Sequence, residues 1–216
     1  MRRILKSMMP RIPQKLILFT FKKIEEMRVD VIDLIKSRRS VRKLRSDPVP
    51  DEVVMKLLEA ARWAPSWANT QCWEFIVIKD PKIKAELSET LVPVRNPAKS
   101  AIANAPVVIA ALGRKGVSGF YRGSAVTNKG DWLMFDVALA VQNLVLEAHA
   151  LGLGTVIIGA IDFERASKIL NLPPEVELVA LIPVGYPDEV PQAPPRKKLS
   201  DMVYQDVYGN KMITAQ

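Results

Sequence analysis

The sequence predicts an α+β fold, a sandwich in which helices cover both faces of a mixed β-sheet. Helix-like and strand-like patterns alternate along the 216 residues, which indicates a sheet with helical connections. The helices are nevertheless too many and too apolar for a simple doubly wound sheet. Hydrophobic residues make up 49% of the chain and charged residues 25%, the balance of a globular domain with a substantial core.

The elements of the first half are each predicted by a local pattern. Asp51 and Glu52 place negative charge in the first turn of a helix, where the helix dipole favours it. Val54, Leu57 and Ala61 follow at helical spacing. The β-branched and aromatic run before Lys79 and the apolar run after Pro106 are typical of strands. We expect helices at 31–37, 51–63 and 81–91 and strands at 74–78 and 106–112.

The second half begins with a segment rich in glycine, serine and basic residues, which we interpret as a mobile loop or lid at 113–130. Residues 131–151 form a helix that is apolar nearly all round, so it belongs at the domain centre or a subunit interface. Asp136 and Glu147 within it argue against a membrane span. The remaining elements are a strand at 152–159, a helix at 162–170, a strand at 177–184 and an extended arm from about residue 187.

The chain divides into a basic N-terminal extension, residues 1–28, and a domain at 29–216 that includes the arm. Residues 1–27 hold seven basic and two acidic residues, so +5 of the net charge of +8 lies there. Three interpretations stay open: an extra surface helix, a start site upstream of Met27, and, behind these, a basic membrane-surface anchor. Because the rest of the chain carries only +3 and no nucleic-acid motif, we expect no nucleic-acid partner.

Cysteine and histidine occur once each, as Cys72 and His149. A lone cysteine forms no disulfide within the chain, which favours a reducing, cytoplasmic location. One histidine and one cysteine do not make a zinc site, and no acidic stretch has the spacing of a calcium loop. We therefore expect no metal centre, and core positions for both residues.

The arginine-rich run R-R-S-V-R at 38–42 is the first candidate binding site. Arg38, Arg39 and Arg42 bring three guanidinium groups, Ser40 adds a hydroxyl, and no carboxylate lies among them. Guanidinium groups suit bidentate phosphate recognition, although a solvated basic turn is the alternative. The glycines at 152–159 lack the spacing and context of a dinucleotide fingerprint, and there is no Walker A motif. Arginines would therefore hold any phosphate.

The run A-P-S-W-A-N-T-Q-C-W at 64–73 is the second candidate site. It offers hydroxyl, amide and indole groups without charge, a set that suits a flat, neutral, hydrogen-bonding heterocycle better than a phosphate or a metal. The alternative is an ordinary helix-to-strand loop with aromatic side chains in the core. Since no pair of acids, Ser-His-Asp set or activated cysteine stands out, enzymatic chemistry would have to come from a bound cofactor.

Five motifs, in this order and spacing, resemble the FMN-dependent nitroreductase superfamily of NAD(P)H-dependent nitro- and flavin reductases. They are R-R-S-V-R at 38–42, P-S-W-A-N-T-Q-C-W at 65–73, G-L-G-T-V-I-I-G at 152–159, P-V-G-Y-P at 183–187 and R-K-K-L at 196–199. The resemblance covers about residues 29–205. It implies a nitroreductase-like α/β sandwich with a mixed or antiparallel central sheet, and a homodimer in which the C-terminal arm is domain-swapped.

The resemblance also implies an FMN site at the subunit interface. One subunit would bind the phosphate and the ribityl chain through Arg38, Arg39, Ser40 and Arg42, with Arg196 and Lys198 closing on the phosphate from the arm. The same subunit would line the ring near N5, chiefly through backbone groups, with Ile157, Ile158 and Gly159. Arg42 would reach toward the isoalloxazine. The other subunit would place its proline–serine loop against the flavin, with Pro65, Ser66, Trp67, Asn69 and Gln71.

The implied reaction passes hydride from NADH or NADPH through FMN to a small oxidised acceptor such as a nitroaromatic, a quinone or a flavin. Acceptor contacts are expected in the lid, at Phe120, Tyr121 and Arg122. Reductive dehalogenation and flavin fragmentation, found in relatives, stay open, although the lid offers no acidic partner for the ammonium group of an amino-acid substrate. A non-catalytic protein that docks on membrane or nucleic acid through residues 1–27 is the alternative from another class.

The chain departs from the family pattern at two positions. The usual Q-P-W is Q-C-W, so Cys72 replaces a rigid proline. Gly159 stands where many nitroreductases carry an acidic residue. This difference narrows the branches of the nitroreductase superfamily that the chain resembles. Asn96 and Lys99 are candidates for a further flavin-contacting pair, in a loop that aligns poorly.

Overall fold

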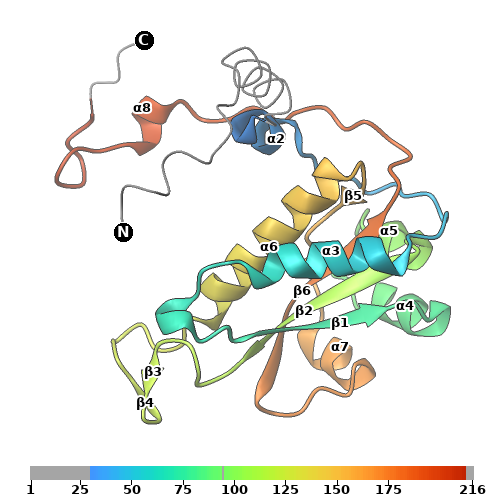
Figure 1. Cartoon of the computed structure of the whole chain (residues 1–216), viewed down its shortest axis with the longest axis horizontal. Helices are drawn as coiled ribbons and strands as arrows, with labels where there is room; N and C mark the ends of the chain where they lie inside the picture. Colours follow the sequence, from blue (N-terminus) through green and yellow to red (C-terminus); the bar gives the residue numbers. More distant parts are fainter. Residues whose placement is uncertain (1–29, 94, 213–216) are drawn as a thin grey trace, which may run out of the picture. The chain divides into compact units, whose positions relative to one another are not determined.

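The computed structural model describes residues 30–93 and 95–212, in two compact units that divide after Ser37. The first unit contributes one described helix, α2 (Val31–Ser37), with the bounds expected from the sequence. All other elements belong to the second unit (Figure 1). The predicted basic extension at 1–28 lies outside the described residues.

The core of the second unit is a four-stranded sheet in the order β1-β2-β6-β5. Its strands are β1 (Trp73–Ile78), β2 (Val107–Arg114), β6 (Val176–Gly185) and β5 (Gly154–Thr155). All strand pairs are antiparallel. A parallel bridge between Ser40 and Thr155 adds the segment after α2 to the β5 edge, so the sheet is mixed, as expected.

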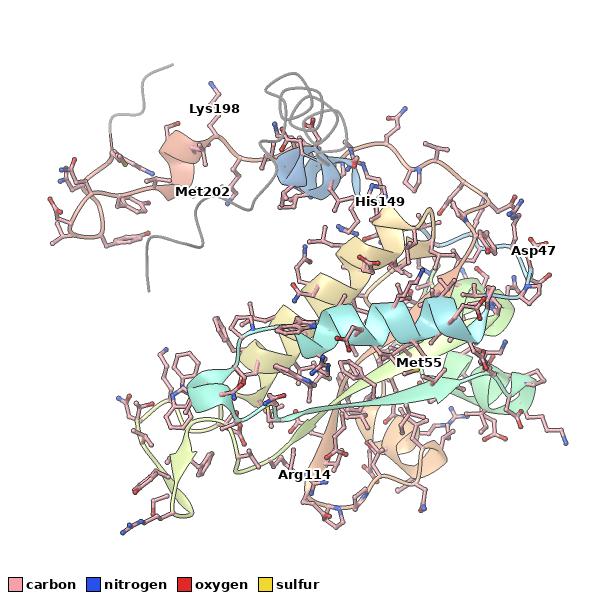
Figure 2. The ribbon with its side chains drawn as sticks, viewed as in Figure 1. Asp47, Met55, Arg114, His149, Lys198 and Met202 are labelled. Carbon is pink, nitrogen blue, oxygen red and sulfur yellow. The ribbon has the colours of Figure 1, made fainter. Side chains whose placement is uncertain are left out.

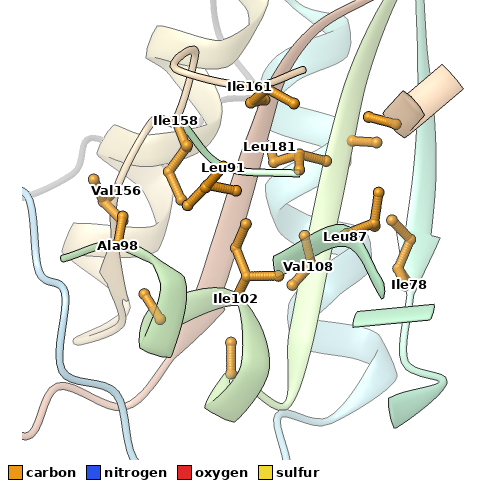
Figure 3. Close-up of a cluster of buried hydrophobic side chains, with 14 of the residues drawn as sticks. Ile78, Leu87, Leu91, Ala98, Ile102, Val108, Val156, Ile158, Ile161 and Leu181 are labelled. Atoms are coloured by element: carbon orange, nitrogen blue, oxygen red, sulfur yellow. The ribbon is translucent and has the colours of Figure 1, made fainter. Parts of the chain in front are cut away.

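Helices cover both faces of this sheet. On one face lie α3 (Asp51–Arg62) and α6 (Leu133–Ala150), and on the other α4 (Pro81–Ser88), α5 (Lys99–Asn104) and α7 (Phe163–Ile169) (Figures 1 and 2). Successive residues of β2 alternate between the two cores: Val107 and Ile109 pack under α3 and α6, and Val108 under α4 and α5 (Figure 3). This alternation is the period of a strand that is buried on both faces. The predicted α+β sandwich is confirmed.

A β-bulge on β6 shifts the side-chain alternation within this strand. Ala111 of β2 pairs with Ala180, but the next residue, Leu112, pairs with Leu178, so Val179 is an extra residue. Leu178 therefore packs on the α4 side, whereas Ala180 packs on the α6 side. One inserted residue reverses the face of every side chain beyond it, so Leu178 and Ala180, two positions apart, lie in different cores.

Local capping explains where two of the helices begin. Asp80 accepts hydrogen bonds from the N–H groups of Lys82 and Ile83, and Pro81 occupies the first turn of α4. Asp162 accepts from the N–H of Arg165 at the start of α7. Both arrangements satisfy amides that the helix itself leaves unpaired.

Two expected elements are shorter in the structure. The helix predicted at 81–91 ends at Ser88, because the next residues pair with the segment before α7: Leu91 bridges to Ile161, and the N–H of Asp162 bonds the carbonyl of Thr90. The strand predicted at 152–159 is limited to Gly154–Thr155, with one further bridge from Ile158 to Leu181. The short helices α5 and α8 (Leu199–Met202) were not expected from the sequence.

Helix α6 is the one helix in the described part of the chain with the length and apolar composition of a membrane span. Its residues Val137, Val141, Leu144 and Val145 are buried against the sheet and α3. Met134 and Phe135, near its N-terminus, remain 53% and 56% exposed. A core helix of a soluble domain passes the same test of composition, and the packing of α6 on the sheet favours that interpretation.

Candidate functional site

The arginine-rich segment lies along the edge of the sheet next to β5. The N–H of Val41 donates to the carbonyl of Thr155 at 2.9 Å, and Ser40 bridges to Thr155. A Cβ on Gly154 would lie 2.9 Å from Leu44 and 3.0 Å from Val41, so only glycine allows this close approach. The segment is thus fixed to the sheet through its backbone. The guanidinium of Arg39 donates to the carbonyl of Arg38 at 2.8 Å, and that of Arg42 donates to the carbonyl of Ser40 at 3.4 Å.

A cavity of about 320 Å³ lies over this segment. Its lining contains four arginines, one serine and no acidic residue; the lining residues are Arg38, Arg39, Ser40, Arg42, Pro191, Gln192, Pro194 and Arg196. We call this set the arginine cradle. Burial lowers the pKa of Arg38, and the positive charges of Arg39 and Arg196 lower it further. An anion bound here would relieve that repulsion.

The C-terminal arm closes the arginine cradle within the same chain. The N–H of Asp188 bonds the carbonyl of Lys43, and the carboxylate of Glu189 accepts from the N–H groups of Arg42 and Lys43 at 2.7 and 3.1 Å. These contacts direct the following residues past the cradle, where Arg196 joins the lining. Lys198, by contrast, precedes α8 as its N-cap residue and is not part of the lining (Figure 2).

The segment after β5 presents two of its three candidate residues to solvent. Ile157 is 47% exposed, and Gly159 has open space where a Cβ would lie. Ile158 points into the core and is 4% exposed (Figure 3). Its N–H and carbonyl both pair with Leu181, so its backbone groups are used within the sheet. Only Ile157 and Gly159 of the predicted triplet are placed to meet a ligand.

The two candidates in the poorly aligned loop make local contacts. Asn96 accepts from the N–H of Ala98 and donates to the carbonyl of Val92. The ammonium of Lys99 pairs with Glu89 at 2.5 Å. These side chains therefore stabilise the turn before α5 in this structure.

The proline–serine loop lies at the other end of the sheet and contains the short helix η1 (Trp67–Asn69). Ser66 Oγ accepts from the N–H of Gln71 at 2.9 Å, and the Gln71 amide donates to Asn69 Oδ1 at 3.3 Å. Ala68, Asn69 and Gln71 all have positive φ, at 44°, 57° and 48°. Since such backbone is unfavourable for residues with a Cβ, contacts elsewhere must hold the loop in place.

A buried carboxylate, Asp136 of α6, supplies these contacts. It is 1% exposed and accepts from the N–H of Trp67 at 3.1 and 3.2 Å and from Ser118 Oγ at 2.6 Å. Cys72 Sγ lies 3.8 Å away. Burial raises the pKa of Cys72 to about 11, and the charges of Asp136 and Asp131 contribute to this shift. Asp136 thus joins the loop, the strand after it and the start of the lid.

Apolar side chains form a cavity of about 390 Å³ beside this loop. Its lining is Pro65, Ser66, Trp67, Trp132, Phe135, Asp136 and Leu139. The rings of Trp132 and Phe135 meet edge to face, with centroids 5.5 Å apart and an interplanar angle of 77°. Sequence reasoning missed Trp132, Phe135 and Asp136; the signal for Asp136 was an acid within an otherwise apolar helix.

The predicted lid has a fixed base and an exposed tip. At the base, Ser118 is fully buried, and a Cβ on Gly119 would lie 2.6 Å from Trp132. At the tip, β3 (Phe120–Tyr121) and β4 (Ser124–Ala125) form a hairpin whose turn residues Arg122 and Gly123 both have positive φ. Tyr121 is 65% exposed, and the guanidinium of Arg122 lies 5.3 Å from its ring centroid.

The arginine cradle and the proline–serine loop lie at opposite ends of α6. Helix α6 ends at Ala150, shortly before β5, whose Thr155 pairs with Ser40 and Val41 of the arginine-rich segment, so the cradle lies at this end. Burial and the charges of Arg38 and Arg39 lower the pKa of His149, which lies in the last turn of α6 (Figure 2). Asp136, in the first turn, holds the loop. At a rise of 1.5 Å per residue, the 13 steps from Asp136 to His149 span ~20 Å. One chain therefore presents two separate candidate sites.

No group of three His, Cys, Asp or Glu side chains within the described residues is arranged to hold a metal ion. The polar groups at both ends of α6 instead suit an organic ligand with an anionic part and a flat apolar part. The donors of the arginine cradle suit the anionic part, and the apolar lining beside the loop suits the flat part.

Comparisons with known proteins agree with this arrangement. The Nitroreductase family profile matches residues 35–186. NADH dehydrogenase of Thermus thermophilus is 32% identical over 177 residues, covering 70% of this chain and 84% of its own. Iodotyrosine deiodinase of Thermotoga neapolitana is 30% identical over 187 residues, covering 77% and 94%. A solved iodotyrosine deiodinase bound to FMN and 3-iodo-L-tyrosine is 26% identical, with a TM-score of 0.68 over 82% of this chain and 99% of that one.

The family profile spans more than half of the chain, and the relatives match over most of their own length. The fold predicted from the sequence motifs and the prediction of an oxidoreductase are both confirmed. The chain belongs to the Nitroreductase family.

Proposed function

We propose that this protein is an FMN-dependent NAD(P)H oxidoreductase whose flavin sites are each built from two copies of the chain. The observation that carries the proposal is the separation of the two candidate sites by the length of α6. The rise of ~20 Å along α6 is longer than the ribityl chain that joins the phosphate to the ring, which favours a flavin shared between two copies over one held by the cradle and the loop of a single chain. In a homodimer, the cradle of one copy and the loop of its partner would enclose it.

The arginine cradle fits the phosphate of FMN. Four guanidinium groups and the Ser40 hydroxyl surround the cavity without an acidic side chain in the lining. The pKa of Arg38 is lowered first by burial and then by the positive charges of Arg39 and Arg196, and a phosphate dianion would offset these charges. Arg196 contributes from the arm, and Lys198 reaches the phosphate only if the arm moves.

The surface next to the cradle fits the flavin ring. Val41 and Ser40 pair with Thr155, so Ile157 and Gly159 follow the cradle directly along the sheet edge. Ile157 offers an exposed apolar side chain, and Gly159 allows a ring to approach the backbone. The partner's copy of the proline–serine loop would cover the other side with neutral amide and indole groups.

FMN supplies the redox chemistry when bound, because it accepts hydride from NAD(P)H and passes it to an acceptor. The chain's own residues bind the phosphate, orient the ring and exclude water. The arginine cradle provides positive charge that favours an anionic reduced ring. No side chain of the site has to act as an acid or base.

The exposed apolar end of α6 supports a homodimer. Met134 and Phe135 are more than half exposed although both are large and apolar, and Trp63 is 73% exposed. Exposed apolar surface on this scale is typical of an interface. Since the arm as far as Arg196 packs on its own chain, only the part beyond Arg196 would be swapped onto a partner in such a dimer. The single cysteine suits the cytoplasmic location predicted from the sequence.

The acceptor class is proposed as a nitroaromatic, a quinone or a flavin. Residues 113–130 contain no Asp or Glu, so this lid has no carboxylate to hold the ammonium group of an iodotyrosine-like substrate. The composition of the lid therefore argues against deiodination of an amino acid, despite the deiodinases among the relatives.

An absorbance spectrum of the purified protein tests the proposal. We expect flavin bands that bleach under anaerobic addition of NADH or NADPH and return when a quinone is added. The faster donor identifies the electron source. The protein is also incubated with FMN, and unbound FMN is removed by gel filtration. A protein that is still colourless after this step would contradict the proposal and favour the non-catalytic docking protein.

A further inference from the structure

We propose that the acceptor is an aromatic or quinonoid anion and that Lys129 of the lid pairs with its anionic group. The proposal rests on the proposed function, because it places the acceptor over the flavin. It names the substrate class and assigns Lys129 as a specificity-determining residue.

The first observation is the charge of the lid. Residues 113–130 contain Arg114, Lys115, Arg122 and Lys129 and no acidic residue. Arg114 is already paired, with Glu74 at 2.7 Å and Glu175 at 4.0 Å. Among the described residues, no carboxylate lies within ion-pair distance of Arg122 or Lys129. Arg122 stacks on the ring of Tyr121, and Lys115 lines a different cavity, together with Glu164 and Glu177. Lys129 is therefore the lid cation best placed for an anionic ligand.

The second observation is an apolar cavity beside one of these cations. A cavity of about 630 Å³ is lined by Lys129, Asp131, Trp132, Met134, Phe135 and Ala138. It shares Trp132 and Phe135 with the cavity next to the proline–serine loop. A flat ring lying against these aromatic side chains would thus lie between the loop, which faces the flavin, and the ammonium of Lys129.

The one carboxylate in this lining is held by backbone amides. Asp131 Oδ2 accepts from the N–H of Gly116 at 2.7 Å, and Asp131 Oδ1 accepts from the N–H of Leu133 at 2.8 Å. The second of these amides belongs to the first turn of α6, whose dipole favours a negative charge there. Asp131 is therefore committed to the protein, whereas Lys129 offers its ammonium to an anion.

Rate measurements on two half-reactions test the proposal: oxidation of the reduced flavin by an acceptor, and reduction of the oxidised flavin by NADH or NADPH. The FMN-loaded enzyme is reduced with light and mixed with 4-nitrobenzoate or with its neutral analogue 4-nitrobenzamide. We expect Lys129→Gln to lower the rate constant for 4-nitrobenzoate by about fivefold, the size of an exposed ion pair, and to leave 4-nitrobenzamide unchanged. The difference should shrink as salt is added.

The matched control is Lys82→Gln, which removes one positive charge from α4 on the opposite face of the sheet. It should change neither rate. Equal effects of Lys129→Gln on both acceptors, or no effect on either, would overturn the proposal.

The second arm separates the acceptor from the hydride donor, whose phosphate groups are also anionic. Reduction of the oxidised enzyme by NADH and by NADPH is measured for the same variants. If Lys129→Gln slows only this step, the lid recognises the donor and the acceptor proposal is wrong. A wild-type enzyme that neither donor reduces would instead contradict the proposed function itself.

Discussion

The two ends of α6 differ in the side chains that surround them: the surroundings are charged at one end and neutral or apolar at the other. At its C-terminal end, the arginine cradle gathers like charges and has no carboxylate in its lining. At its N-terminal end, one buried carboxylate, Asp136, organises neutral and apolar groups around itself. In the cradle, positive charges lie close together. At the loop end, Asp136 has its hydrogen-bond partners, but the buried Thr70 Oγ1 and Trp132 Nε1 have none, and large apolar side chains are exposed.

This contrast teaches that the two ends suit different parts of a ligand. The arginine cradle presents concentrated positive charge, and the loop end presents exposed apolar side chains. A flavin phosphate would suit the first, and a flavin ring bound by a second copy would suit the second. Changes at the two ends should consequently have opposite effects on the stability of the flavin-free protein.

Asp136→Ala should have the largest effect. It leaves the Trp67 N–H and the Ser118 hydroxyl without their acceptor, so we expect a loss of about 3 kcal/mol in the free energy of unfolding. Urea unfolding of the flavin-free protein measures this. Asp136→Asn keeps one acceptor oxygen, so its free energy of unfolding should lie between those of the wild type and Asp136→Ala. Equal stability of all three proteins would show that Asp136 does not organise this end.

Arg38→Met should act in the opposite direction on stability. Removing one of the crowded charges, while the apolar stem remains, should raise the melting temperature of the flavin-free protein. The same change should weaken FMN binding about 50-fold, since charge-assisted hydrogen bonds to the phosphate are lost. Quenching of FMN fluorescence measures the affinity. Arg165→Met, on α7, is the matched control and should leave FMN affinity unchanged.

Cys72 should be a poor nucleophile despite its position next to the loop. Its pKa rises from 9.0 to about 11, so at neutral pH the reactive thiolate is about 100-fold rarer than in the unfolded chain. The rate of maleimide labelling, in native buffer and in urea, measures the ratio. Asp136→Asn removes a negative neighbour and should speed native labelling. Labelling as fast in native buffer as in urea would contradict the buried environment.

His149 should give the smallest effect, a pH dependence at the cradle end. The pKa of His149 is lower in the folded protein than in the unfolded chain, so acid protonates the unfolded chain first. The contribution of neutral His149 to the stability of the folded protein is therefore present above pH 6.5, and it is lost as the pH falls through the folded pKa. His149→Gln should therefore lose less melting temperature between pH 7.5 and pH 5.5 than the wild type. FMN should reduce the difference, because its phosphate neutralises Arg38 and Arg39. An identical pH dependence in both proteins would contradict this.

Sequence patterns predicted most of the fold because its elements follow simple periods. The bounds of α2 were predicted without error, and those of α3, β1 and α6 within two residues, because apolar spacing and flanking charges define them. The short end of α4 was not predictable from its own residues. It depends on pairing between Leu91 and Ile161, which are 70 positions apart. Helix α5 has only six residues and lacks a side-chain cap.

Residues of the candidate site were predictable from the sequence where a motif lies on exposed backbone. They were less predictable where contacts with distant residues decide which way a side chain points. The arginine run and Arg196 line one cavity, and their binding of FMN stays a prediction. Ile158 was expected beside the ring, but its pairing with Leu181 turns it into the core, which a motif alone does not show. Asp136 makes contacts 64 and 69 residues away, to Cys72 and Trp67, and such contacts leave no local pattern.

The measurement that most directly tests the shared site is the flavin content of a mixed dimer. Two differently tagged chains are co-expressed and the heterodimer is purified: one carries Arg38→Met in the cradle, and the other carries Ser66→Trp, which fills the cavity beside the loop. If each site joins the cradle of one copy to the loop of the other, one of the two sites is intact. We predict one FMN per heterodimer and almost none in either homodimer. A heterodimer without flavin, beside a wild type with two, would contradict the account, because every site would then lie within a single chain.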